Sequence, residues 1–177
     1  MHGLIFAGLR AYSFERLGSD AAERLWAGHS YDPTKAYEDE DFLARLEALR
    51  ATTGDSADEL QRAFGVFTGQ TTFAALYPDY YGANDGTLPF LLGVEEQIHT
   101  VVRATIHGSR PPKLHVVALG TGGVLVSYTS ERGLCRLLEG LVHGVARHYG
   151  EAVVVEEIQC MREGDPGCVY SVLQAAA

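Results

Sequence analysis

The chain has 177 residues, a length that suits one domain with a substantial hydrophobic core. Its formal charge is −9 and it contains no run of Lys or Arg, which argues against nucleic acid or an anionic membrane surface as a partner. No apolar stretch reaches the roughly 18 residues that a membrane span needs. The apolar start lacks the basic segment and cleavage site of a signal peptide. With three cysteines and no secretion signal, we expect a protein of a reducing compartment, the cytoplasm.

The first half of the chain is predicted to be helical. An apolar first helix should end at Gly18, and Ser19 should cap the second helix. The acidic residues 39–41 suit the first turn of a third helix, because negative charge is favourable at a helix N-terminus. Ser56 and Glu59 have the spacing of a capping box, which predicts a fourth helix after Ser56.

The longest helical pattern covers residues 88–107. Apolar residues recur there at spacings of three and four, and His99 lies on one of the two resulting stripes. Gly108 should end this helix, and Pro111 and Pro112 prevent its continuation.

The second half changes to the pattern of an antiparallel sheet. Segments rich in Val and Leu predict two hairpins with a helix between them. The predicted elements are strands 113–119 and 124–128 with a turn at 120–123, a helix over 134–149, and strands 152–159 and 168–173. The expected fold is therefore α+β: an N-terminal helical lobe, then a lobe with the long helix and a four-stranded antiparallel sheet with one further helix.

Two short segments carry candidate binding residues. His99 on its helix could bind iron through a neutral imidazole, although a single His is more often a buried side chain satisfied by a hydrogen bond. Tyr128, Ser130 and Arg132 alternate after a strand, so their polar ends face one side. Two hydroxyls and a guanidinium suit a pair of carboxylates, but the same pattern also suits a solvated strand end. Haem is a ligand that requires both segments and an apolar slot between them.

Taken together, these residues resemble the H-NOX family of haem nitric oxide/oxygen-binding sensor domains, which also occur in soluble guanylate cyclase. The resemblance runs nearly end to end. It implies one domain over residues 1–177, with a distal helical lobe over about 1–62 and a proximal haem-binding lobe over about 63–177. The residues that carry it are Met1, Gly3 and Ile5; Tyr77-Pro78-Asp79-Tyr80; His99, followed thirteen residues later by Pro112; and Tyr128-x-Ser130-x-Arg132.

The resemblance implies a haem-based gas sensor. Haem b would be held by His99, with Tyr128, Ser130 and Arg132 on its propionates and Pro112 setting its conformation. In the family, nitric oxide weakens the bond between iron and the His on the opposite face. The helix that carries the His then moves and the lobes rotate. The domain thus has two conformations, and one ligand bond shifts the equilibrium between them.

Catalysis by this chain itself is not expected. It shows no nucleophile–base pair and no Gly-rich phosphate loop. The sequence ends at Ala177, so we expect signal output through a separate protein. Stand-alone bacterial members of the family regulate a histidine kinase or a cyclic-di-GMP enzyme, and such a partner is expected by analogy.

The gas preference is predicted from an apolar distal side. Family members that hold oxygen carry a Tyr about five residues after the motif Arg, and Leu137 stands there in this chain. Ile5, Leu9 and Phe73 are also expected on the distal side, and all are apolar. Because an apolar pocket cannot stabilise the charge separation of bound oxygen, we expect nitric oxide and carbon monoxide to bind and oxygen not to be held. The alternative is that Tyr12 or another hydroxyl reaches the pocket.

A second constellation consists of Cys135, Cys160 and Cys168. Three thiolates can hold zinc with a fourth ligand. A subset of bacterial H-NOX proteins has such a site with three Cys and one His, but Glu157 occupies the expected His position here. A regular strand would point Glu157 away from Cys160, so a bulge or another ligand is required. Three ordinary buried thiols and a thiol redox switch are the alternatives.

Two further functions compete with the haem sensor. Residues 160–168 also resemble vinyl-reductase-like small-ligand domains, which predicts a haem-free small-molecule-binding module in which His99 only fills space. The third hypothesis is a redox sensor whose input is the thiols or zinc.

Overall fold

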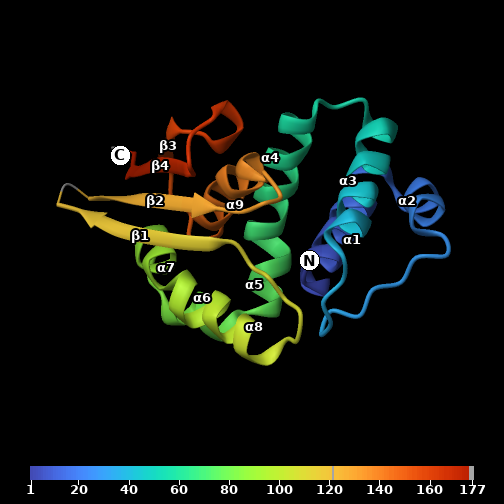
Figure 1. The fold of residues 1–177 in the computed structure, drawn as a ribbon, viewed down its shortest axis with the longest axis horizontal. Coiled ribbons are helices and arrows are strands. Elements are labelled where there is room, and N and C mark those ends of the chain that lie inside the picture. Colours follow the sequence, from blue (N-terminus) through green and yellow to red (C-terminus); the bar gives the residue numbers. More distant parts are fainter. Residues whose placement is uncertain (121, 176–177) are drawn as a thin grey trace.

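The N-terminal lobe is a group of helices at one end of the molecule. The computed structural model describes residues 1–120 and 122–175. Helices α1 (Gly3–Leu17), α2 (Ser19–Trp26) and α3 (Asp39–Thr53) lie together, and α4 (Ala57–Phe67) stands between them and the sheet (Figure 1). The predicted capping box at the start of α4 is confirmed, with the Glu59 amide donating to Ser56 Oγ at 3.2 Å. The predicted end of the first helix at Gly18 is also confirmed.

The middle of the chain is more helical than the sequence indicates. Helix α4 continues through a π-helical turn, η1 (Thr68–Thr72), into α5 (Phe73–Leu76). Pro78 then begins α6 (Pro78–Ala83), because a Pro at the first helical position loses no hydrogen bond.

The predicted helix over 88–107 consists of three consecutive segments. They are α7 (Thr87–Val94), a second π-helical turn η2 (Glu95–His99) and α8 (Thr100–Thr105). His99 is the last residue of η2, and such π-helical turns are frequent at functional sites.

The sheet contains both predicted hairpins. Its strands are β1 (Lys113–Leu119), β2 (Gly123–Thr129), β3 (Val153–Gln159) and β4 (Cys168–Gln174), all antiparallel in the order β1-β2-β4-β3. The short helix η3 (Met161–Glu163) lies between β3 and β4. Part of the predicted turn at 120–123, residue 121, lies outside the described residues. The four strands and helix α9 (Cys135–His148) confirm the α+β class.

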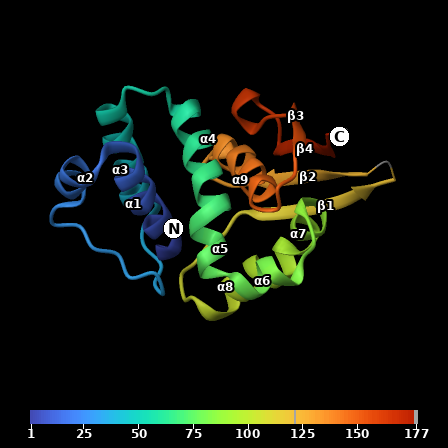
Figure 2. The ribbon, with the colours of Figure 1, turned by 180° about the vertical axis from the view of Figure 1, so that it is seen from behind.

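Helix α9 connects two hydrophobic cores. Leu137 packs with the core of the N-terminal lobe, whereas Leu138 and Val142 belong to the core shared with the sheet and α7. Helix α9 runs alongside α4, as both ribbon views show (Figures 1 and 2). The predicted lobe boundary near residue 62 falls inside α4 and stays a prediction.

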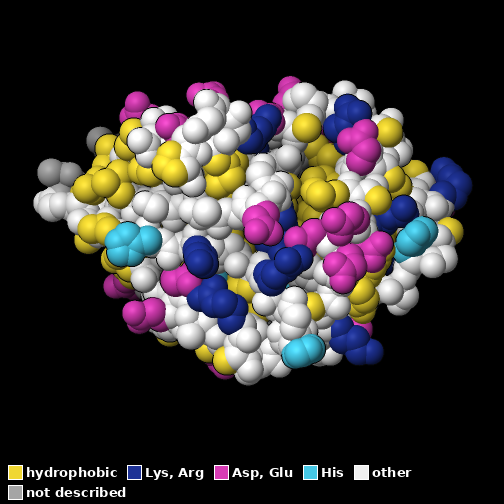
Figure 3. All heavy atoms as spheres, viewed as in Figure 1, with side chains coloured by type: hydrophobic (Ala, Val, Ile, Leu, Met, Phe, Trp, Pro, Cys, Tyr) yellow, Lys and Arg dark blue, Asp and Glu magenta, His cyan; other side chains and the backbone are white. Residues whose placement is uncertain are grey.

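The surface mixes charges of both signs. Acidic and basic side chains lie next to one another across the middle of the face in Figure 3, and apolar side chains gather over the strands. None of the helices in the described part of the chain combines the length and apolarity that crossing a membrane requires.

Candidate functional site

An apolar cavity lies between α9, the α7–η2–α8 segment and the strands β1 and β2. Helix α9 supplies Leu137 and its apolar neighbours to the lining, the α7–η2–α8 segment supplies His99, and the N-terminal residues supply Ile5. The cavity brings together eight of the residues predicted from the sequence, namely His99, Pro112, Tyr128, Ser130, Arg132, Ile5, Phe73 and Leu137. Leu9 does not line it; this residue is fully buried in the core of the N-terminal lobe, because its face of α1 packs inward.

His99 is held by a carboxylate within its own turn. Its Nδ1 lies 3.0 Å from Glu95 Oε2, so the ring proton on Nδ1 is engaged and the Nε2 lone pair is left for a metal. Burial lowers the pKa of His99 below its ordinary value, although the Glu95 carboxylate acts in the opposite direction. The imidazole is therefore neutral near pH 7, which is the form that binds iron.

Tyr128, Ser130 and Arg132 form a polar rim on the cavity. Tyr128 faces inward from β2, and burial raises the pKa of its hydroxyl to about 12, so that it stays a donor. Ser130 Oγ accepts the Arg132 amide at 3.3 Å. The Arg132 guanidinium is only 8% exposed, and its Nε forms an ion pair with Asp39 Oδ1 at 2.9 Å. The guanidinium is therefore already paired with one carboxylate, and its remaining N–H groups are the ones that suit a further anion.

Asp39 also belongs to this rim, although no pattern in the sequence indicates it. Asp39 Oδ1 contacts Arg132 and also the N-terminal amine at 2.7 Å, and Arg110 lies 3.5 Å from Oδ2. Burial alone would raise the pKa of Asp39, but the amine and Arg132 hold it below its ordinary value. In the sequence, Asp39 indicates only the acidic first turn of a helix. Its partner Arg132 lies more than ninety positions later, and no local pattern connects the two residues.

The donor set fits haem. The long apolar walls suit a flat hydrophobic ring, and His99 Nε2 offers one ligand to its metal. The hydroxyls and the remaining N–H groups of Arg132 suit two carboxylates at the ring edge. His99 and the rim line the same cavity from different elements.

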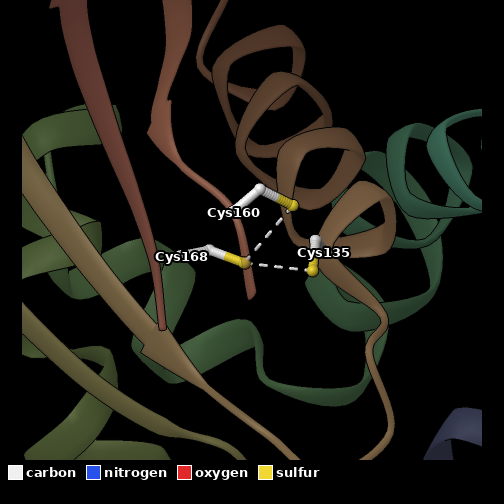
Figure 4. Close-up of side chains that lie close together, drawn as sticks. All are labelled: Cys135, Cys160 and Cys168. Atoms are coloured by element: carbon white, nitrogen blue, oxygen red, sulfur yellow. Dashed lines mark hydrogen bonds between the residues drawn. The ribbon is translucent and has the colours of Figure 1, made fainter. Parts of the chain in front are cut away.

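The three cysteines are brought together, as the sequence indicated. Cys168 Sγ lies 3.0 Å from Cys135 Sγ and 4.0 Å from Cys160 Sγ, and all three side chains are buried (Figure 4). They come from the start of α9 and the two ends of the β3–β4 connection. Burial is the main cause that raises the pKa of the Cys135 and Cys160 thiols.

Glu157 lies beside Cys160 but outside the close group of three sulfur atoms among the described residues, and its role as a fourth ligand stays a prediction. The strand register shifts between Glu157 and Gln159, which is the irregularity that the sequence argument required. The carboxylate is nevertheless engaged elsewhere, accepting from the Tyr170 hydroxyl at 2.7 Å and lying 2.8 Å from an Arg136 nitrogen. The metal-ligand group among the described residues contains only the three cysteines.

This combination of an α+β fold and an apolar cavity with His99 in its wall is that of a ligand-binding domain. The sequence model described as haem-NO-binding matches residues 2–157. The chain therefore belongs to the haem-NO-binding family, the H-NOX domains, which bind haem and act as gas sensors. A comparison with curated proteins found no match.

Solved H-NOX structures share the fold. A Shewanella oneidensis H-NOX protein in the Fe(II)NO state is 22% identical with a TM-score of 0.90, covering 99% of this chain and 100% of that one. A K. algicida H-NOX mutant in the unliganded Fe(II) state is 19% identical with a TM-score of 0.79, covering 99% and 97%. An oxygen-binding H-NOX domain in its oxygen complex is 19% identical with a TM-score of 0.87, covering 99% and 96%. Because both oxygen and nitric oxide complexes have this fold, the fold does not decide the gas.

Proposed function

We propose that this protein is a nitric oxide sensor that holds haem b in the cavity through His99. The observation that carries the proposal is the placement of His99 and the Tyr128–Arg132 rim on one apolar cavity. Bound ferrous haem would supply an iron with one open position for nitric oxide or carbon monoxide. Tyr128, Ser130 and Arg132 would orient the group through its carboxylates, and Pro112 would contact it from the cavity wall.

An absorption spectrum tests haem binding. Protein expressed with added haem precursor should show a Soret band, and His99→Gly should lose it or shift it. Supplying imidazole to His99→Gly should restore the ferrous spectrum, because the free ligand can enter the space that the side chain leaves. A missing Soret band in the unaltered protein would contradict the proposal and favour the haem-free module.

Selection against oxygen is proposed from the α9 wall. Leu137 and the neighbouring lining residues of α9 are apolar, so they offer no donor to a polarised ligand. Tyr12 packs against Phe64 and Phe67 and is absent from the lining. Of the hydroxyls beyond the rim, that of Tyr81 donates to the Gly69 carbonyl at 2.6 Å.

Two substitutions test this selection. Leu137→Tyr should create an oxygen complex that survives exposure to air, because its hydroxyl can donate to bound oxygen. Tyr77 also lines the cavity, so Tyr77→Phe is the matched control and should leave the gas preference unchanged. An oxygen complex that persists in the unaltered protein and is lost in Tyr77→Phe would show that Tyr77 is the donor and that the proposed selection is wrong.

We further propose that the signal leaves through movement of the α7–η2–α8 segment that carries His99. The partner is proposed to be a separate histidine kinase or cyclic-di-GMP enzyme in the cytoplasm. Purified partner activity should respond to the nitric oxide form of this protein and not to the form without gas. The same assay with a mild oxidant in place of nitric oxide tests the redox-sensor alternative, in which the oxidant would be the effective input.

Zinc binding by Cys135, Cys160 and Cys168 is proposed as a separate structural feature. Three sulfur atoms lie within 4.8 Å of one another, close to the spacing of a tetrahedral thiolate site. Glu157 could become the fourth ligand only by leaving Arg136. Metal analysis should find about one zinc per chain, and Cys168→Ser should lower it. Three freely titrating thiols in metal-replete protein would contradict this.

A further inference from the structure

Glu95 contacts the proposed iron ligand and is itself held from three sides. Its Oε2 lies 3.0 Å from His99 Nδ1 and accepts the Leu114 amide at 3.1 Å, and its Oε1 pairs with Arg103. The carboxylate is 27% exposed, and its partners come from η2, α8 and β1. Such fixed geometry means that the contact with His99 does not depend on a mobile surface side chain.

A carboxylate at Nδ1 changes the chemistry of the other ring nitrogen. It attracts the Nδ1 proton, gives the ring partial imidazolate character, and makes Nε2 a stronger donor to a metal. A stronger donor binds iron more tightly and favours the oxidised over the reduced state. The Arg103 guanidinium draws electron density from the same carboxylate and therefore limits the effect.

We propose that Glu95 tunes the bond between His99 and the haem iron, strengthening it against displacement by nitric oxide and lowering the reduction potential. The inference rests on the proposed function, since it requires haem on His99. Arg103 pairs with Glu95 and so limits how strongly the Glu95 carboxylate polarises the imidazole. The gas sensitivity of the protein would thus be set by residues that touch neither the gas nor the haem.

Three variants separate this electronic role from a structural one. Glu95→Gln keeps an oxygen that can accept from His99 and Leu114 but removes the charge. Glu96→Gln is the matched control, because Glu96 is exposed on the same turn and loses the same charge. Arg103→Gln keeps Glu95 and removes its counter-ion at a side chain that is 36% exposed, where a substitution costs little stability.

The measurements are the iron–His stretching band of the ferrous protein and the midpoint potential. Glu95→Gln should move the band to lower frequency and the potential to more positive values. Arg103→Gln should move both in the opposite directions, and Glu96→Gln should move neither. The nitric oxide complex would exist in two forms, one with the iron–His99 bond broken and one with it intact. Glu95→Gln should raise the ratio of the broken to the intact form about tenfold.

The outcomes distinguish this inference from the proposed function. No Soret band in the unaltered protein contradicts haem binding itself. A normal Soret band with an unmoved stretching band in both Glu95→Gln and Arg103→Gln contradicts only the role of Glu95. If Glu95→Gln fails to fold, Arg103→Gln still tests the role of Glu95. A stretching band at higher frequency supports that role, and an unmoved band or one at lower frequency contradicts it.

Discussion

The close crossing of α4 and α9 predicts a large effect from one added methyl group. Gly140 faces α4, and a Cβ at this position would lie 2.2 Å from the Arg62 carbonyl oxygen and 2.9 Å from its carbon. Both atoms belong to the backbone, so no side chain can rotate away. Gly140→Ala therefore has to push the two helices apart by about 1 Å to reach an ordinary contact distance.

The expected cost follows from two opposing terms. Overpacking of this kind costs about 1–3 kcal/mol or more, and a gap of about 1 Å removes much of the dispersion energy along the crossing. Alanine regains about 1 kcal/mol through its higher helix propensity. We expect a net loss of about 2 kcal/mol, which lowers the unfolding midpoint of a chain of this size by about 4–8 °C.

Thermal and urea unfolding of the haem-free protein measure this loss. Gly82→Ala is the matched control, because Gly82 is also helical and its added Cβ would meet no atom within 4 Å. The control should be as stable as the unaltered protein or more stable by up to about 1 kcal/mol. If Gly140→Ala were as stable as Gly82→Ala, the close backbone crossing of α4 and α9 would be refuted.

Three further predictions concern a cap and two titrating groups. Ser56→Ala should cost about 1 kcal/mol and lower the unfolding midpoint by about 2–4 °C, because the Glu59 amide loses its acceptor. Thr52→Ala is the control, because Thr52 is exposed in the last turn of α3 and its hydroxyl caps no helix N-terminus. Asp39 has a lowered pKa in the folded protein, so its contribution to stability is present above the unfolded pKa and is lost as pH falls through the folded value. Asp39→Asn should therefore be less stable at pH 7 and lose less stability on acidification, and parallel acid-unfolding curves for the two proteins would contradict this. Burial raises the pKa of Tyr128 to about 12, so the unfolded chain loses this proton at lower pH than the folded protein and stability should fall from about pH 10 to about pH 12. Tyr128→Phe should reduce that fall. Identical curves of unfolding free energy against alkaline pH for the two proteins would show that Tyr128 does not contribute.

Much of the fold could be predicted from local sequence signals. The capping box at Ser56, the end of α1 at Gly18 and the two hairpins depend on residues close together in the chain, where short-range hydrogen bonds and backbone preferences decide. The π-helical turns and α6 could not be predicted in this way. A π-helical turn keeps the apolar character of its neighbours, and Pro78 can either interrupt a helix or begin one.

The sequence by itself determined which chemical groups the site can use. The residue types supply an imidazole at His99, two hydroxyls and a guanidinium at and just after the end of β2, and three thiols, which are the groups that the haem and zinc proposals require. Only the tertiary structure decided which groups meet. In the folded chain Leu9 lies outside the cavity, and the Glu157 carboxylate contacts Arg136 and Tyr170. Asp39 contacts Arg132, and Glu95 contacts both His99 and Leu114. These pairings join separate elements, and their energies depend on distance and burial, which no local pattern of residues contains.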